Sequence, residues 1–458
     1  MLLEQNSGSG YTNRTQSNGR VYIETYGCQM NVSDSEVVAS ILQSNGYSLT
    51  SKLDEADVIL VNTCSIRDNA EERVWGRLDV FRQYKKRNPS VIVGVLGCMG
   101  ERLKDSFFDK KNLVDIVVGP DAYRELPVLL RSAEGGQSGI NVLLSREETY
   151  ADISPVRLDK NGVSAFVSIM RGCNNMCSYC VVPYVRGAER SRDPETIARE
   201  VKELIDDGYR EVTLLGQNVN SYNWTVENGG LVGFAKLLEL VAQINPTLRV
   251  RYSTSHPKDL SDEVLLTMAR FGNICSHVHL PVQSGSSRIL GLMNRGYTRE
   301  YYMGRVEAIR RILPDCAIST DVIAGFCSET DADHRETLSL MQWANFDFAY
   351  MFKYSERPNT KAARRLPDDV PDETKTRRLT EIIALQGKLS EQSKKKDVGK
   401  TFEVLIEGVS KKSDQHFYGR TSQNKVVVFP KGDSRIGDFV RVAVLKTTPA
   451  TLIGEIVL

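Results

Sequence analysis

Three cysteines stand close together in the middle of the chain, at Cys173, Cys177 and Cys180. They follow an apolar stretch, residues 165–170, whose loose alternation predicts a β-strand, so we expect them in the loop at its C-terminal end. A structural zinc site normally has four ligands, and no fourth cysteine or histidine is close in sequence. Three thiolates can instead hold a 4Fe-4S cluster and leave one iron open to an outside ligand. A reduced or zinc-bound thiol loop is the alternative.

A second set of cysteines, Cys28, Cys64 and Cys98, is spaced by 36 and 34 residues. Each follows a predicted strand, and the spacing is about that of one strand–helix–strand unit. In a parallel sheet with right-handed crossovers, all three would emerge at the same edge, which is where such sheets bind ligands. The spacing therefore predicts a second three-cysteine site with one metal position open. Three unrelated small residues at strand ends are the alternative.

The elements that carry this second set predict a doubly wound parallel sheet. Apolar strands alternate with helical patterns at residues 21–26, 57–62, 91–96 and 114–118. Ser33 and Glu36 predict a capping box at the start of the first helix. We expect a disordered tail over 1–19, an N-terminal domain over 20–146 and a polar linker over 147–160.

The middle of the chain, residues 161–395, predicts a second α/β domain. Six strands, all but the last followed by a helical pattern, are expected at 165–170, 211–215, 248–252, 277–280, 317–322 and 346–350. Six units are too few for a closed eight-stranded barrel, so we expect a partial (β/α)6 barrel with a lateral opening. Polar residues at C-terminal strand ends should line its active site: Gln217, Asn218, Ser255 and Gln283. Ordinary turn or cap residues are the alternative for each.

The C-terminal part, residues 396–458, changes to short strands separated by glycine and polar turns. We expect strands at 401–406, 415–420, 425–429, 439–444 and 452–456, which suggests a small β-barrel of the oligonucleotide-binding type. Before it, residues 361–396 contain ten Lys or Arg against six Asp or Glu. A solvated helical face explains most such charges, but next to an RNA site they could contact phosphates.

The net charge, the cysteine content and the absence of certain motifs limit what the protein can do. The 458-residue chain has a formal net charge of only +1, so a nucleic acid would have to be bound by local basic patches. Nine cysteines in a chain without an export signal suggest a reducing compartment, and we expect a cytoplasmic protein without a membrane segment. The sequence has no Walker loop and no H-E-x-x-H motif.

The Cys-x-x-x-Cys-x-x-Cys motif after a first barrel strand resembles the radical S-adenosylmethionine enzymes. The N-terminal cysteine trio and the stretch Tyr418-Gly419-Arg420-Thr421 with Asn424, which is similar to the TRAM domain, extend this resemblance to the methylthiotransferases. Residues 62–71 and 76–78 resemble the branch that modifies N6-isopentenyladenosine next to the anticodon of tRNA. Neighbouring branches act on threonylcarbamoyl-adenosine in tRNA or on an aspartate of a ribosomal protein, and a non-catalytic Fe–S RNA-binding protein is a further alternative. In all, the sequence predicts an α/β multidomain protein with a C-terminal TRAM barrel.

The resemblance also implies cofactors and partners. It implies a radical SAM cluster on Cys173, Cys177 and Cys180 and an auxiliary 4Fe-4S cluster on the N-terminal trio. One S-adenosylmethionine would donate a methyl group and another would yield the 5′-deoxyadenosyl radical that acts at C2 of the adenine. Further expected partners are the tRNA anticodon stem-loop and a low-potential electron donor such as flavodoxin or ferredoxin, with the protein a monomer.

The same resemblance assigns residues to the two ligands. The cofactor would be contacted by Gln217, Asn218, Ser255 and Gln283, with the first two at its methionyl end. The RNA would be contacted near the N-terminal trio by Asn31, Asn62, Arg67 and Asn69. The chain departs from the family pattern at Gly325-Phe326-Cys327-Ser328, where Gly-Phe-Pro-Gly is common.

Overall fold

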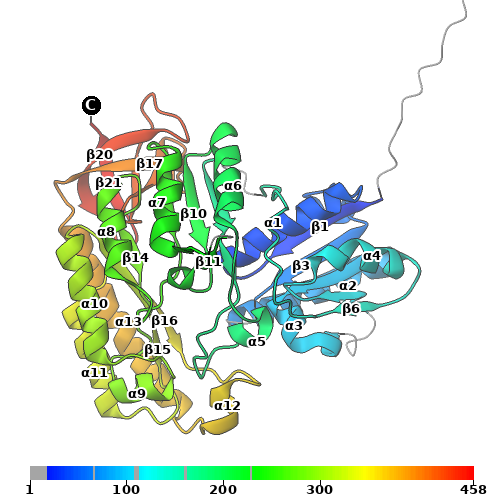
Figure 1. The fold of residues 1–458 in the computed structure, drawn as a ribbon, viewed down its shortest axis with the longest axis horizontal. Helices are drawn as coiled ribbons and strands as arrows, with labels where there is room; N and C mark the ends of the chain where they lie inside the picture. Colours follow the sequence, from blue (N-terminus) through cyan, green and yellow to red (C-terminus); the bar gives the residue numbers. More distant parts are fainter. Residues whose placement is uncertain (1–17, 65–67, 108–112, 159–161, 227–228, 458) are drawn as a thin grey trace, which may run out of the picture.

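The structure is a computed structural model that describes residues 18–64, 68–107, 113–158, 162–226 and 229–457. It consists of an N-terminal α/β unit, a central α/β unit and a small C-terminal β-barrel, and the C-terminal barrel packs on the central unit (Figure 1). Within the described residues, no helix is long and apolar enough to cross a membrane.

The N-terminal unit is built on a six-stranded parallel sheet of order β2-β1-β3-β4-β5-β6. Its strands are β1 Arg20–Thr25, β2 Ser48–Leu49, β3 Val58–Thr63, β4 Ile92–Gly97, β5 Ile116–Val118 and β6 Gly139–Asn141. The helices are α1 Gln29–Ser44, α2 Asp68–Arg87, α3 Cys98–Leu103 and α4 Leu126–Glu134. Strands β3 and β4 are buried along their whole length, as expected when helices cover both faces of a sheet. The predicted doubly wound sheet is confirmed, with two short edge strands that the pattern did not reveal.

Helix α1 begins earlier than its sequence pattern predicts. Cys28 is its N-cap residue, and Asn31 completes the reciprocal capping box that the sequence assigned to Ser33 and Glu36. Glu36 lies inside the helix and is buried against Arg157, whose Nη1 donates to Glu36 Oε2 at 2.8 Å. The prediction of the cap was wrong because a Cys–Asn cap is rare, whereas Ser and Glu at this spacing are the usual signal.

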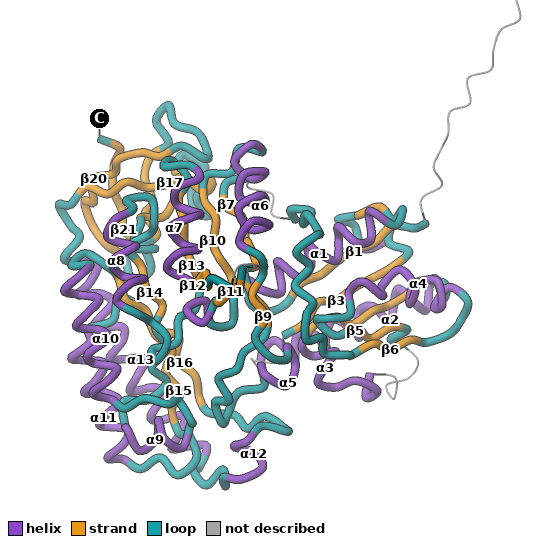
Figure 2. The backbone as a smooth tube through the Cα atoms, viewed as in Figure 1, coloured by secondary structure: helices purple, strands orange, loops and turns teal. Residues whose placement is uncertain are grey.

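The central unit contains the six predicted barrel strands, in two three-stranded parallel sheets of order β13-β10-β7 and β14-β15-β16 (Figure 2). The strands are β7 Ser164–Ser168, β10 Glu211–Leu215, β13 Arg249–Tyr252, β14 His277–His279, β15 Ala317–Ala324 and β16 Phe348–Lys353. An isolated bridge joins Val250 of β13 to Ile274, in the segment that leads into β14, and so brings the edges of the two sheets together. Because β7 and β16 do not pair, the barrel is open on one side, and the predicted partial barrel is confirmed.

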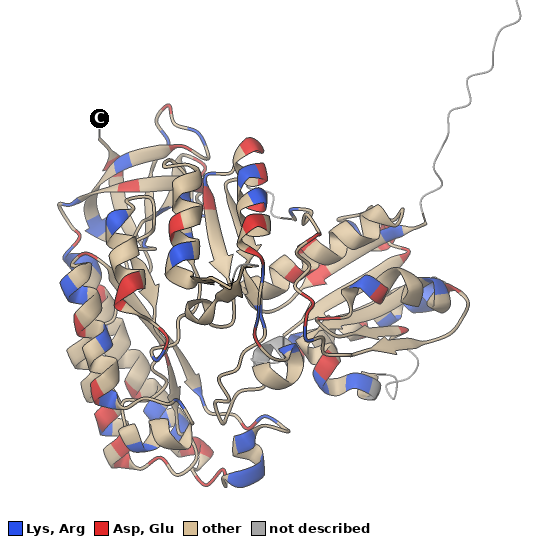
Figure 3. Ribbon diagram, in the orientation of Figure 1, with Lys and Arg blue, Asp and Glu red and all other residues tan. Residues whose placement is uncertain are grey.

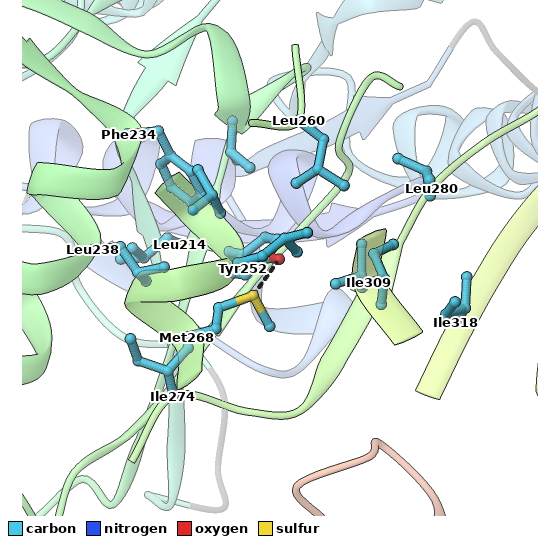
Figure 4. Packing of buried hydrophobic residues seen from close by; sticks show 14 of the residues in the cluster. Leu214, Phe234, Leu238, Tyr252, Leu260, Met268, Ile274, Leu280, Ile309 and Ile318 are labelled. Atoms are coloured by element: carbon cyan, nitrogen blue, oxygen red, sulfur yellow. Dashed lines mark hydrogen bonds between the residues drawn. The ribbon is translucent and has the colours of Figure 1, made fainter. Parts of the chain in front are cut away.

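The helices of the central unit cover the outside of these strands. The long ones are α6 Pro194–Asp206, α7 Phe234–Ile244, α8 Asp262–Arg270, α10 Arg299–Ile312, α11 Asp331–Ala344 and α13 Asp372–Lys395. The shorter elements are β8 Met170–Arg171, α5 Val182–Arg186, β9 Arg190–Ser191, β11 Asn223–Thr225, β12 Leu231–Gly233, α9 Ser287–Leu292 and α12 Lys361–Arg365. Between helices and strands lies the largest apolar core, in which Tyr252 Oη donates to Met268 Sδ at 3.0 Å (Figure 4). This core fixes the strand ends that carry the polar loops.

The C-terminal unit is a closed five-stranded barrel of order β17-β18-β19-β21-β20. Its strands are β17 Thr401–Val409, β18 His416–Thr421, β19 Val426–Pro430, β20 Phe439–Thr447 and β21 Leu452–Ile456. The barrel lies at the N-terminal ends of the central strands, because Arg249 and Arg251 of β13 donate to the carbonyls of Arg420 at 2.8 Å and Thr421 at 2.7 Å. The cysteine loop is at the opposite ends of these strands.

Candidate functional site

The N-terminal cysteines follow three neighbouring strands. Cys28 follows β1, Cys64 follows β3 and Cys98 opens α3 after β4, so all three lie at the C-terminal edge of the sheet. A hydrogen bond with Cys64 lowers the pKa of the Cys28 thiol to about 6, and the positive charge of Arg186 acts in the same direction. The Sγ atom of Cys98 accepts a hydrogen bond from Arg186 Nε at 3.2 Å. Burial raises the pKa of the Cys98 thiol and outweighs the opposing charge of Arg186, so the site favours thiolate at Cys28 but not at Cys98.

Two of the predicted RNA contacts, Asn31 and Asn62, support these cysteine loops. Asn31 Oδ1 accepts from Cys28 Sγ at 3.2 Å, and its Nδ2 donates to the carbonyl of Thr63 at 3.0 Å. Asn62 Nδ2 donates to the Asn31 carbonyl at 2.9 Å, and both side chains are fully buried. A contact with RNA through either amide stays a prediction and would require this network to open.

The other two predicted RNA contacts are not located by the structure. Arg67 lies outside the described residues, and the side chain of Asn69 does too. Their role stays a prediction.

The second cysteine trio lies in the loop after β8. The loop begins at Gly172, whose φ is +78° and where a Cβ atom would lie 2.0 Å from the carbonyl oxygen of Ala188, so only glycine fits. Cys177 Sγ accepts a hydrogen bond from Arg295 Nη1 at 3.3 Å. Burial raises the pKa of Cys173 to about 11 and that of Cys180 to about 12, and the neighbouring Cys177 adds to both shifts.

Burial favours the neutral form of Cys173 and Cys180, and three neighbouring thiols are the donor set that a metal would deprotonate on binding. Desolvated thiols that lie close to one another have unfavourable thiolate forms, whereas a bound metal deprotonates a coordinating thiol outright. Among the described residues, no group of three or more Cys, His, Asp or Glu side chains is arranged as a metal site. The assignment of the six cysteines as cluster ligands therefore stays a prediction that rests on their position and chemistry.

The predicted cofactor residues lie at the C-terminal ends of the barrel strands, beside the cysteine loop. Gln217 Oε1 and Ser255 Oγ are buried without a hydrogen-bond partner among the described residues. A buried polar atom without a partner costs free energy, and such atoms at the mouth of a barrel suit a polar ligand. These two residues fit an S-adenosylmethionine site.

Asn218 has a different position. Its Nδ2 donates to Asp259 Oδ2 at 2.7 Å and its Oδ1 accepts from the backbone N–H of His256 at 3.1 Å. Asp259 also accepts from Asn175 in the cysteine loop at 3.5 Å, so Asn218 orders this loop. Its direct contact with the cofactor stays a prediction.

Gln283 also stays a predicted contact. It adopts φ +71° and forms a bridge with Val322, which places it where the loop after β14 returns to β15. Its side chain is buried.

A buried ionic link joins the two cysteine regions, and no local sequence pattern indicates it. Asp34 of α1 accepts from Arg171 Nη1 and from Arg186 Nη2, both at 2.7 Å. Arg171 immediately precedes Gly172 and the second trio, and Arg186 donates to Cys98 of the first trio. Burial alone would raise the pKa of Asp34, but the two guanidiniums outweigh it, so the pKa lies below its usual value. Asp34 thereby fixes one cysteine region relative to the other.

Further buried pairs close the same interface. Arg190 Nη2 donates to Asp121 Oδ1 at 2.9 Å, and Arg157 donates to Glu36 at 2.8 Å and to Glu200 at 2.6 Å. The N-terminal unit is thus held against the β7 side of the open barrel, with α1 packed on β7 (Figure 2).

Comparisons with known families agree with this architecture. The family model described as the Radical SAM superfamily matches residues 167–341, a model described as Uncharacterized protein family UPF0004 matches residues 20–119, and the TRAM domain matches residues 395–457. The radical S-adenosylmethionine methyltransferase TsrM from Kitasatospora setae has a similar fold, with a TM-score of 0.56 at 12% identity over 76% of this chain and 77% of that one. The Radical SAM family model over the segment that contains the cysteine loop defines a radical S-adenosylmethionine enzyme, with an Fe–S cluster and S-adenosylmethionine as cofactors.

Full-length relatives narrow the class. Proteins named tRNA-2-methylthio-N(6)-dimethylallyladenosine synthase are 58% identical in Phocaeicola vulgatus and 56% identical in Parabacteroides distasonis, each over 99% of this chain and 99% of the relative. The protein of the same name from Porphyromonas gingivalis strain W83 is 53% identical over 100% of this chain and 99% of its own length. The chain belongs to this family of tRNA methylthiotransferases.

Proposed function

We propose that the protein inserts a methylthio group at C2 of N6-isopentenyladenosine next to the anticodon of tRNA. The observation that supports this most directly is the buried link through Asp34, which holds two cysteine trios from different units at one interface. A reaction that joins a sulfur group to a carbon radical requires two reactive centres at a fixed separation. The relatives of 53–58% identity carry the name of this activity.

In this proposal, Cys173, Cys177 and Cys180 hold the radical SAM cluster, and Cys28, Cys64 and Cys98 hold an auxiliary 4Fe-4S cluster. When bound, these groups and two molecules of S-adenosylmethionine supply a methyl group, a held sulfur and a carbon radical able to act at an aromatic C–H bond.

The protein contributes charge and orientation to both clusters. Arg186 and Arg295 place a guanidinium against one thiol of each trio, which offsets the negative charge of the cluster ligands. Gln217 and Ser255 offer their unpaired oxygens to the cofactor, and Gln283 and Asn218 complete that side of the site.

The proposed partners follow from the reaction. Sequence-specific RNA recognition reads unstacked bases in loops, so the anticodon loop would present its modified adenosine to the open side of the barrel. Asn31, Asn62, Arg67 and Asn69 remain the proposed contacts beside the auxiliary cluster. We further propose a low-potential electron donor such as flavodoxin or ferredoxin, a monomeric protein that acts in the cytoplasm, and domain boundaries at 20–146, 161–395 and 396–458.

The test compares substrates for the anaerobically reconstituted protein with S-adenosylmethionine and a reductant. An anticodon stem-loop RNA that carries N6-isopentenyladenosine should gain the mass of a methylthio group, and 5′-deoxyadenosine should form. The same RNA with threonylcarbamoyl-adenosine, and a ribosomal protein, should remain unmodified. Modification of either of these alone would overturn the choice of substrate. Bound RNA without 5′-deoxyadenosine would instead support a non-catalytic Fe–S RNA-binding protein.

A further inference from the structure

The short helix α12, Lys361–Arg365, presents an uncompensated positive face. Lys361, Arg364 and Arg365 are spaced i, i+3 and i+4, so they share one side of the helix. No described Asp or Glu forms an ion pair with any of the three, and Arg364 and Arg365 are exposed. Figure 3 shows α12 as a mostly blue element at the end of the barrel. Like charges at this spacing destabilise an isolated helix, so an anionic partner bound to this face would reduce the repulsion between the three cations.

The helix is fixed to the radical SAM cysteine loop. The side chain of Ala362 is fully buried, and its backbone N–H donates to the carbonyl of Ser178 at 2.6 Å. Ser178 lies between Cys177 and Cys180. The Arg364 guanidinium lies over the ring of Tyr184, 6.0 Å from its centroid, which is a second contact with the segment after the loop. The positive face of α12 is therefore held at the rim of the active site.

The strand that leads to α12 exposes two aromatic rings. Along β16, Ala349 and Met351 face α13 and the core, so Phe348 and Tyr350 point to the other side, into the open barrel. Both rings are about half exposed, at 49% and 47%, and their centroids are 4.9 Å apart in an edge-to-face pair. Tyr350 also contacts His279 of β14, which confirms its orientation toward the barrel interior.

We propose that this edge, made of Phe348 and Tyr350 on β16 and the basic face of α12, binds the single-stranded loop of the RNA substrate. Aromatic rings beside a row of cations are the combination that binds single-stranded nucleic acid, since bases stack on the rings while phosphates meet the cations. The edge runs from the end of the barrel that carries the C-terminal unit to the cysteine loop, so RNA bound along it would approach the cofactor site. This inference rests on the proposed function and names the surface that such a substrate would use.

The test measures the affinity of the reconstituted protein for a fluorescent anticodon stem-loop RNA carrying N6-isopentenyladenosine, by anisotropy at several salt concentrations. The variant K361Q/R364Q/R365Q should bind at least tenfold more weakly, and the slope of log Kd against log salt should fall by about 2, because each phosphate contact to a single strand contributes about 0.7. The variant F348L/Y350L should also bind about tenfold more weakly, with the slope unchanged, because base stacking is independent of salt.

A matched control removes the same number of charges elsewhere. Arg270, Arg311 and Arg335 lie on the outer helices α8, α10 and α11, and the variant R270Q/R311Q/R335Q should bind RNA within twofold of the parent. Iron content and thermal unfolding establish that each variant is folded.

Three results would overturn the inference. In the first, the α12 and β16 variants bind RNA as the parent does while the parent still modifies it, so the proposed function stands without this surface. In the second, the control loses as much affinity as the α12 variant, so the effect is general charge. In the third, the α12 variant keeps its RNA affinity but is reduced more slowly by flavodoxin, so the surface binds an acidic protein. If the parent neither binds nor modifies the RNA, the proposed function fails as well.

Discussion

Replacement of Asp34 by alanine tests the link between the two cysteine regions. The carboxylate receives two guanidinium hydrogen bonds of 2.7 Å, and the side chains of Asp34, Arg171 and Arg186 are 1%, 3% and 4% exposed. Removing one member of a buried ionic group leaves buried charge without compensation, which costs about 3–5 kcal/mol. We expect D34A to lower the free energy of unfolding by this amount, measured by urea unfolding of the reduced, cluster-free protein with circular dichroism.

The control is Asp262, which also pairs with two arginines, Arg305 and Arg311, but has a 48% exposed side chain. Exposed pairs contribute only about 0–1 kcal/mol, so D262A should have a small effect. Equal losses for D34A and D262A would refute the reasoning from burial. The pH dependence gives a second check. Because the pKa of Asp34 is depressed in the folded protein, its stabilisation is fully present above the unfolded value of about 3.9 and is lost only as pH falls through the folded value. The difference between D34A and the parent should therefore be constant from pH 7 to pH 5.

Three further predictions concern the two sites and Glu101, a buried carboxylate on α3, the helix that Cys98 opens. C177A should form no 5′-deoxyadenosine and should keep about half of the iron of the parent, since only one of two 4Fe-4S clusters would be lost; retained cleavage of S-adenosylmethionine would contradict the ligand assignment. S255A should weaken S-adenosylmethionine binding about tenfold in calorimetry and should change the free energy of unfolding by no more than about 0.5 kcal/mol, because Ser255 Oγ has no hydrogen-bond partner in the part of the chain that the structure describes. N218A should instead lower the free energy of unfolding by about 1–3 kcal/mol, because the Asn218 side chain has two internal hydrogen-bond partners. Burial raises the pKa of Glu101 to about 7, so the free energy that its ionised form costs the folded protein grows between pH 4.5 and pH 7. The increase in urea midpoint produced by E101Q should therefore rise over this interval and level off above it. An increase that does not depend on pH would show that the pKa of Glu101 is not perturbed.

Much of the architecture could be predicted because the pattern of strands and helices is strong along the chain. Cys28, Cys64 and Cys98 each mark the end of a buried strand, and parallel pairing then places them at one edge whatever the side chains around them. The six barrel strands and the five strands of the C-terminal barrel were predicted for the same reason, with errors of a few residues at their ends. Local periodicity determines these elements.

The contacts between units could not be predicted in this way. Asp34 and its partners Arg171 and Arg186 are 137 and 152 residues apart, and nothing in the local pattern distinguishes them from surface charges. The burial of Asn31 in α1 and Asn62 in β3 arises within the N-terminal unit, where the two side chains, 31 residues apart, bond to each other, and no local pattern indicates this pairing either. Packing between residues far apart in the chain decides whether these polar side chains are buried, and this packing leaves no periodic pattern in a single sequence.

The attachment of the C-terminal barrel has a consequence for the order in which the chain matures on the ribosome. Arg249 and Arg251 are made well before their acceptors at Arg420 and Thr421. Arg251 already has Glu211 of β10 as an ionic partner within the central unit, and the C-terminal barrel adds the main-chain acceptors later. The C-terminal barrel, which is translated after the central unit, therefore supplies main-chain acceptors at the base of the central strands only after those strands have been made.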